Sequence, residues 1–114
     1  MKVKDYYKKN FEFSSGGIAG EDYREFEKQC KKELKQIVGG YGFTLHKFNK
    51  NHYCWSAVLE RDGKYVYVSM SDVRWFDWYK VLVRTMKHET DWTGGSNNHC
   101  NFDEVGMMAD RLSK

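Results

Sequence analysis

Histidines and cysteines are the residues of this sequence with the widest chemical repertoire. The chain has four histidines and three cysteines, which in principle could supply zinc ligands. Structural zinc sites usually contain pairs spaced Cys-x-x-Cys or His-x-x-x-His, and the sequence contains neither spacing. The neighbours His88-Glu89 and His99-Cys100 would point their side chains apart on a strand. We therefore expect no metal site and no cofactor.

Cys54 is the cysteine with the best prospects as a nucleophile, which needs a base within hydrogen-bond reach. On adjacent strands it could lie near His46 or His52, with Asp72 near a strand end. The residues around Cys54 match no known nucleophile motif, and cysteine is often buried as a small hydrophobe. We expect no catalytic residues and a protein that is not an enzyme.

The segment from Asp91 to Asn98 reads Asp-Trp-Thr-Gly-Gly-Ser-Asn-Asn, with two glycines among hydroxyl and amide side chains. Such a loop can present backbone N–H groups to an anion. Walker-type phosphate loops also need a Lys-Ser/Thr step and a helix start, which are absent. The main interpretation is a structured turn with Asx-type hydrogen bonds. The alternative is a binding loop that uses Trp92, Asn97 and Asn98.

Tyrosines are expected on one face of a predicted strand. Tyr65 and Tyr67 alternate there, and Glu60 lies across from Tyr65 on the neighbouring strand. Large amphipathic side chains of this kind anchor protein partners or stack on nucleic-acid bases. A covering helix, such as one near the amino terminus, would instead bury this face.

The segment Trp75-Phe76-Asp77-Trp78-Tyr79 has four bulky aromatic residues within five positions. They cannot all be buried in so small a chain, so we expect at least one to face solvent or a partner. The predicted partner-binding residues are Tyr65, Tyr67, Glu60, Trp75, Trp78, Trp92, Asn97 and Asn98.

The composition predicts a folded chain whose 114 residues leave room for one hydrophobic core. Apolar residues make up 40% and aromatic residues 17%, which excludes an intrinsically disordered chain. The net charge of +3 is mildly basic, below that of a dedicated nucleic-acid-binding domain. The sequence shows no signal segment, no membrane span and no disulfide framework. We therefore expect a cytoplasmic protein with no membrane association.

The clearest predicted element is a helix from Glu21 to Val38. Its apolar residues recur at steps of three and four and form one stripe: Tyr23, Phe26, Cys30, Leu34 and Ile37. Gly39-Gly40 is expected to end this helix in the left-handed conformation. Four lysines lie off the stripe and form a basic flank, the candidate nucleic-acid-binding set: Lys28, Lys31, Lys32 and Lys35.

Three strands are predicted to follow at residues 41–48, 53–61 and 64–71, with Asn49-Lys50-Asn51 as a turn between the first two. Asp62-Gly63 is the strongest short hairpin signal, and its two-residue turn pairs Arg61 with Lys64. A slip by one residue would exchange the two faces of the sheet, so the turn makes the face assignment firm. The face expected to pack on the helix consists of Trp55, Ala57, Leu59, Val66, Val68 and Met70.

The last third of the chain is less regular. Residues 78–88 contain a short apolar run, which by itself does not separate strand from helix. The β-branched residues Val81, Val83 and Thr85 favour a strand. Residues 103–112 are predicted to form a short closing helix with one apolar face.

The expected fold class is α+β, with one main amphipathic helix packed on a three- to four-stranded antiparallel sheet and a short C-terminal helix. Residues 1–20 are expected to be an amino-terminal segment, which has room for one short helix, and a flexible connector. The whole chain, residues 1–114, is predicted to be a single compact domain.

A resemblance to a known group of proteins lies in the carboxy-terminal third. Leu82-Val83-Arg84-Thr85-Met86-Lys87-His88-Glu89, followed by the segment from Asp91 to Asn98, resembles small accessory proteins of phages and mobile elements. Several anti-CRISPR proteins are of this size and origin. The resemblance implies an inhibitor that binds a host CRISPR effector nuclease, either the protein or its guide-loaded complex, and that has no catalysis of its own.

Two functions are therefore expected. The first is an anti-CRISPR-like inhibitor that blocks a Cas nuclease. Because the chain is basic, it would act through an aromatic patch or on the guide-loaded complex, not as an acidic mimic of DNA. The alternative is a small nucleic-acid-binding domain that uses surface tyrosines and the lysine flank. Either could be a monomer or a homodimer, since the strand at 41–48 offers an uncovered edge.

Overall fold

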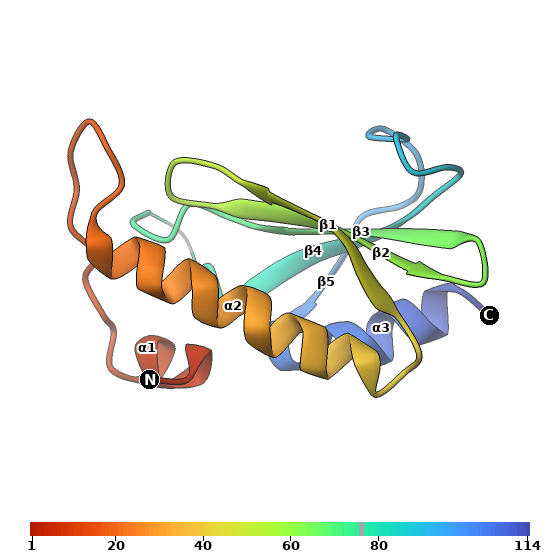
Figure 1. The fold of residues 1–114 in the computed structure, drawn as a ribbon, viewed down its shortest axis with the longest axis horizontal. Helices are drawn as coiled ribbons and strands as arrows, with labels where there is room; N and C mark the ends of the chain where they lie inside the picture. The colour runs from red at the N-terminus through yellow and green to blue at the C-terminus, as the bar shows by residue number, and fades with distance from the viewer. Residues whose placement is uncertain (76) are drawn as a thin grey trace.

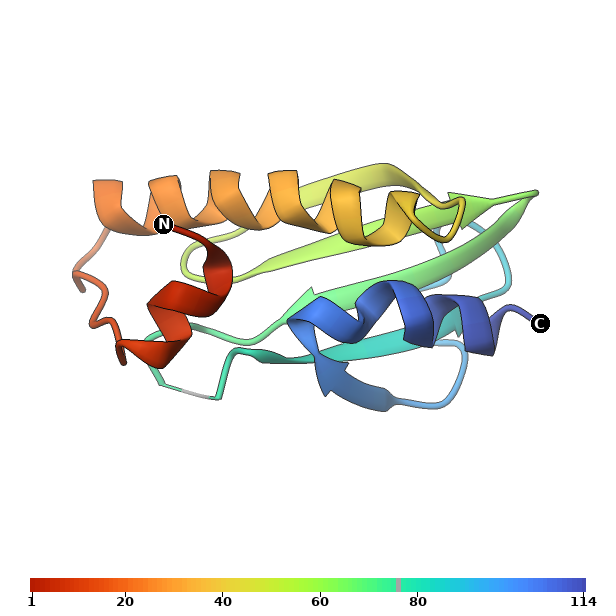
Figure 2. The ribbon, with the colours of Figure 1, turned by 90° about the horizontal axis from the view of Figure 1, so that it is seen from below.

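The computed structural model describes residues 1–75 and 77–114, and Phe76 lies outside the described residues. Five strands form one antiparallel sheet in the order β1-β2-β3-β4-β5. Helices α2 and α3 lie side by side on one face of this sheet, and α1 lies beside α2 (Figures 1 and 2). The elements are α1 (Val3–Lys8), α2 (Glu21–Gly39), β1 (Thr44–Lys50), β2 (Trp55–Arg61), β3 (Lys64–Met70), β4 (Lys80–Met86), β5 (Asn98–Asn101) and α3 (Val105–Leu112).

The α+β fold class is thus confirmed, with one strand more than predicted. Strand β5 reads Asn-His-Cys-Asn, in which only Cys100 is buried. So short and polar a segment has no alternating pattern to detect, and it is a strand because it pairs with β4. A 3₁₀ turn, Phe102–Glu104, then leads into α3, which confirms the predicted closing helix.

Helix α2 buries the predicted apolar stripe against the sheet except at Ile37, which is half-buried, while the neighbouring Val38 is buried. Tyr23, Phe26, Cys30 and Leu34 are each 1% exposed or less. The predicted left-handed stop at Gly39-Gly40 is wrong, because the capping residue Gly40 has a right-handed φ of −61°. The left-handed residue is Gly42, with φ of 82°, and the chain turns there toward β1.

The hairpin of β2 and β3 has the predicted register, with Arg61 opposite Lys64 and Leu59 opposite Val66. Asp62 and Gly63 have φ values of 52° and 77°, and positive φ at both central residues is the signature of a type I′ turn. The apolar face predicted from this register is buried, and it packs with α2 in the core.

Strand β1 runs further along the chain than predicted. Asn49 and Lys50 belong to the strand rather than to a turn, and the connection to β2 comes at residues 51–54. Lys50 consequently lies on the helix-facing side of the sheet, two residues after Phe48. The register also shifts at His46, where a β-bulge interrupts the pairing with β2.

Helix α1 packs on α2, so the described helices all lie on one side of the sheet and leave its far face without a helix (Figure 1). The Val3 N–H donates to Glu33 Oε2 of α2 at 2.9 Å, and Tyr6 stacks among Phe13 and Phe26. Among the residues described, the helices lack the combination of length and apolar character that crossing a membrane requires.

Candidate functional site

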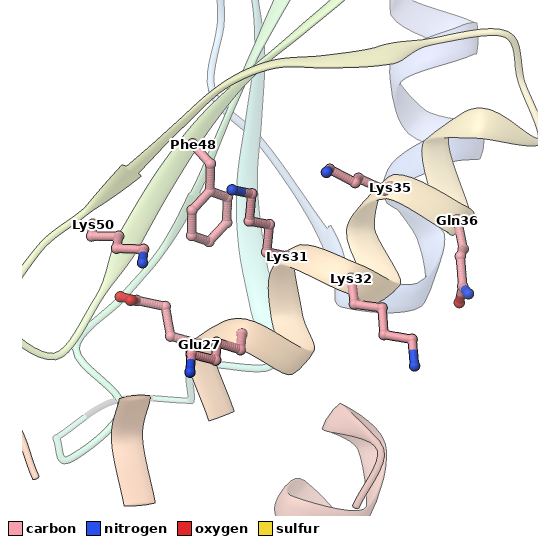
Figure 3. A pocket seen from close by; sticks show the side chains of 8 residues that line it. Glu27, Lys31, Lys32, Lys35, Gln36, Phe48 and Lys50 are labelled. Atoms are coloured by element: carbon pink, nitrogen blue, oxygen red, sulfur yellow. The ribbon is translucent and has the colours of Figure 1, made fainter. Parts of the chain in front are cut away.

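A groove of about 500 Å³ lies between α2 and the edge strand β1. Five lysines line it, four from the helix and one from the strand, together with one aromatic ring and one carboxyl group (Figure 3). The lining residues are Glu27, Lys28, Lys31, Lys32, Lys35, Gln36, Phe48 and Lys50. The structure therefore gathers the four predicted lysines of the helix and adds groups from a second element.

The spacing of side chains along a helix and along a strand explains why these residues lie in one groove. Positions 28, 31, 32 and 35 differ by three and four, so their side chains share one flank of α2. On β1, residues two apart share a face, so Phe48 and Lys50 both point toward the helix. Helix α2 packs directly beside β1, which closes the two rows into one groove.

The groove concentrates positive charge that its single carboxyl group, Glu27, offsets only in part. Lys28 and Lys32, like Lys31 and Lys35, are four residues apart on α2, and like charges at that spacing weaken a helix by a few tenths of a kcal/mol. In the described parts of the chain, no groove lysine forms an ion pair with a carboxylate. Such an arrangement favours an anion from outside.

Phe48 is the aromatic side chain of the groove and is half-buried. Its ring packs on the buried Trp55, with centroids 5.2 Å apart. The Lys31 ammonium lies 5.8 Å from the ring centroid. The ring thus packs on the core through Trp55, and the flexible, charged side chain of Lys31 lies near its face in the groove.

Glu27 is the single acidic group of the groove lining. Its side chain is only 5% exposed, and Oε2 has no hydrogen-bond partner among the residues described. Burial raises the pKa of Glu27, while the nearby Tyr23 hydroxyl and the Lys50 charge lower it by less. Figure 3 shows the carboxyl group pointing toward Lys50.

The outer face of the sheet carries the predicted tyrosines, and none of the described helices covers it (Figure 1). Tyr65 and Tyr67 are half-buried. The Tyr67 ring meets Trp92 in a T-shaped contact at 5.9 Å, and the Arg84 guanidinium lies 4.7 Å from its centroid. Arg84 also donates a hydrogen bond to the Trp92 carbonyl. The loop after β4 therefore folds back over part of this face.

A second contact holds the same loop to the bulge of β1. His46 Nε2 and Glu89 Oε2 are 2.6 Å apart, and the His46 ring lies 5.4 Å from that of Tyr65. The hydrogen bond with His46 lowers the pKa of Glu89. Glu60 is also occupied, because its Oε1 accepts the Gly63 N–H of the hairpin turn at 3.1 Å.

The Gly-rich segment is a structured turn of the Asx type, as the main interpretation predicted. Asp91 accepts the backbone N–H groups of Lys87 and Thr93 with its own carboxylate. Gly95 has φ of 81°, and a Cβ there would lie 2.6 Å from the Thr85 carbonyl oxygen. The glycine is needed because the loop touches the backbone of β4.

Trp75 and Trp78, which were both predicted to bind a partner, differ in their exposure to solvent. Trp75 is 69% exposed, which fulfils the expectation of a solvent-facing aromatic. Trp78 is only 6% exposed and packs on Phe13 and Phe26, so its prediction as a surface contact is corrected: it belongs to the core.

The two asparagines of the predicted set lie at the end of the loop. Asn97 is exposed, whereas Asn98 begins β5 and donates to the Ser96 carbonyl at 2.9 Å. Neither residue lies at the lysine groove, so the predicted set divides between the outer face, the loop and the core.

Cys54 lacks the surroundings of a nucleophile. It is half-buried, and burial followed by the charge of Asp72 raises the pKa of its thiol. The His46 side chain hydrogen-bonds Glu89 instead, and His52 Nε2 contacts the Gly16 carbonyl oxygen. The thiol is therefore protonated at neutral pH and has no base hydrogen-bonded to it.

Sequence reasoning missed Glu27, Phe48 and Lys50 as members of the groove. The strand prediction ended at Phe48 and placed Lys50 in a turn, which removed the alternation that pairs them. Glu27 shares the helical flank with Lys28 and Lys31. Its position next to the apolar stripe could have indicated that its carboxyl group is buried beside the lysines.

No known protein family, curated protein or solved structure matches this chain.

Proposed function

We propose that this protein is a non-enzymatic binding protein for single-stranded nucleic acid, held in the groove between α2 and β1. The observation that supports this most directly is that five lysines line one groove together with the Phe48 ring, and that one of them, Lys31, lies over that ring. Lysine side chains contact phosphates, and aromatic side chains stack on bases. The combination suits a strand whose backbone follows the lysines while one base enters the groove.

A single strand fits this arrangement better than a duplex. In a duplex the flat faces of the bases are already stacked on one another, whereas single strands can turn a base outward onto an aromatic ring. The groove volume of about 500 Å³ is within the range of pockets that hold drug-sized ligands, which covers one nucleotide.

The test is a fluorescence titration of a labelled oligothymidine at two salt concentrations. Binding should weaken steeply with salt, because cations are released from the phosphates when lysines replace them. The double variant Lys31→Glu/Lys35→Glu should abolish binding. Lys80→Glu/Lys87→Glu makes the same charge change at exposed positions outside the groove and should retain most of it.

Circular dichroism of both variants establishes that they are folded. Equal affinity of the groove variant and the wild type would contradict the proposal, as would binding that does not depend on salt.

The second proposal is the anti-CRISPR-like inhibitor that the resemblance implies, and a different surface supports it. Tyr67, Arg84 and Trp92 cluster on the outer face, and Trp92 remains 45% exposed. Tyrosine, tryptophan and arginine are the residue types that dominate the binding energy of protein interfaces. The partner would be a host CRISPR effector nuclease, bound by this protein as a monomer or a homodimer.

Inhibition of a panel of Cas nucleases tests this second proposal. Trp92→Ala should abolish inhibition, and the groove variant Lys31→Glu/Lys35→Glu should retain it. The reverse pattern would assign the inhibition to nucleic-acid binding in the groove. For both proposals we expect the protein to act in the cytoplasm, where its three free cysteines stay reduced.

A further inference from the structure

We propose that Glu27 makes the groove selective for bases that present N–H donors on their Watson–Crick edge, guanine above all. This inference rests on the proposed function, since it concerns the base that enters the groove. It assigns a role to Glu27, an acidic side chain whose presence in a groove of lysines is otherwise unexplained. A carboxylate among phosphate-binding lysines would weaken binding unless it contacted another part of the ligand.

The position of Glu27 supports the assignment. Its side chain is 5% exposed, and its carboxyl group points from α2 toward the β1 side of the groove, where Phe48 and Lys50 lie (Figure 3). Oε2 has no hydrogen-bond partner among the described residues. A base that stacks on Phe48 would therefore bring its edge toward an acceptor that is already desolvated.

The neighbouring Tyr23 does not saturate this acceptor. Tyr23 precedes Glu27 by one helical turn, and its buried hydroxyl is close enough to lower the pKa of Glu27 but forms no well-aligned hydrogen bond among the described residues. A tyrosine hydroxyl has a single hydrogen to donate, whereas a carboxylate has about four acceptor positions. One hydroxyl therefore occupies at most one acceptor position, and the other positions of the carboxylate can receive N–H groups from a ligand.

The chemistry of the base edges gives the order of preference. Guanine presents N1–H and the N2 amino group side by side, which matches the two oxygens of one carboxylate. Cytosine and adenine present one amino group beside an acceptor nitrogen. Thymine and uracil present N3–H between two carbonyl oxygens, which a carboxylate repels. A good bidentate contact discriminates by about 1–3 kcal/mol, roughly fivefold to 150-fold, so about tenfold is an expectation near the low end of that range.

The experiment compares short labelled thymidine oligonucleotides that carry dG, dC, dA or dT at the central position. The wild type should bind the dG oligonucleotide about tenfold more tightly than the all-dT one. Glu27→Gln keeps the shape of the side chain but replaces one acceptor with a donor. We expect this variant to bind the all-dT oligonucleotide at least as well as the wild type and to lose the dG preference.

A second measurement needs no variant. Replacing central dG by deoxyinosine removes the N2 amino group alone, and affinity should fall toward that of the all-dT oligonucleotide. Equal affinities for the dG, deoxyinosine and dT oligonucleotides would overturn the role of Glu27. If that binding still weakened with salt, the proposed function would stand without it. An unchanged dG preference in Glu27→Gln would also overturn the role of Glu27. If no oligonucleotide binds at low salt, the proposed function fails, and this inference fails with it.

Discussion

The Lys31 ammonium of α2 lies 5.8 Å from the centroid of the Phe48 ring of β1. This contact joins the helix to the edge of the sheet across the lysine groove. Its two members correspond to the two halves of a nucleotide, since one carries a charge for a phosphate and the other an aromatic face for a base.

Phe48→Leu tests the aromatic half. Leucine keeps an apolar side chain against Trp55 but removes the ring, so affinity for a single strand should fall by about 1 kcal/mol, roughly fivefold. Phe48→Tyr retains the ring and should bind like the wild type. The measurement is a titration at fixed salt, and equal affinities of the leucine and tyrosine variants would exclude stacking on this ring.

Lys35→Ala tests the proposed phosphate contact through the salt dependence of the binding constant. Each phosphate contact with a single strand contributes about 0.7 to the slope of log K against log salt concentration. The variant should lose about that much slope, whereas Lys80→Ala outside the groove should lose none. A lower affinity with an unchanged slope would mean that Lys35 supports the groove without contacting phosphate.

Glu27→Gln should increase the stability of the free protein at neutral pH. Burial raises the pKa of Glu27 above its ordinary value of 4.5, so Glu27 takes up a proton at a higher pH in the folded state than in the unfolded state. The resulting stabilisation is complete below the ordinary pKa and is lost as the pH rises through the raised pKa. The unfolding free energies of wild type and variant should therefore be closest in acid and diverge toward neutrality.

Urea unfolding at a series of pH values measures this divergence. A difference between Glu27→Gln and wild type that does not change with pH would mean that Glu27 has the same pKa in the folded and unfolded states.

Gly95→Ala should destabilise the protein more than Gly63→Ala. Both glycines have positive φ, 81° and 77°, so alanine at either costs about 1–2 kcal/mol of backbone strain. Only at Gly95 would the new Cβ collide with backbone, 2.6 Å from the Thr85 carbonyl oxygen, whereas nothing lies near Gly63. Thermal unfolding of the two variants measures the difference, and equal losses would show that the loop moves away from β4 at little cost.

The helix and the hairpin could be predicted because each follows from local rules. The stripe from Tyr23 to Leu34 has the helical period, and Asp62-Gly63 sets a register that assigns each strand residue to a face. The lysine flank followed from the same helical period. These features depend on residues a few positions apart, so a single sequence contains the information for them.

The tertiary structure alone decided what the lysine flank faces. Phe48 and Lys50 join it because α2 packs beside the edge strand β1, and β5 exists only because β4 offers it a partner. Trp78 was expected at the surface but is buried, because α1 and the following segment bring Phe13 and Tyr7 onto it. Such contacts join residues far apart in the sequence. Their stabilising free energy comes from apolar burial and from charges brought together by folding, so the spacing of apolar residues along a short segment does not predict them.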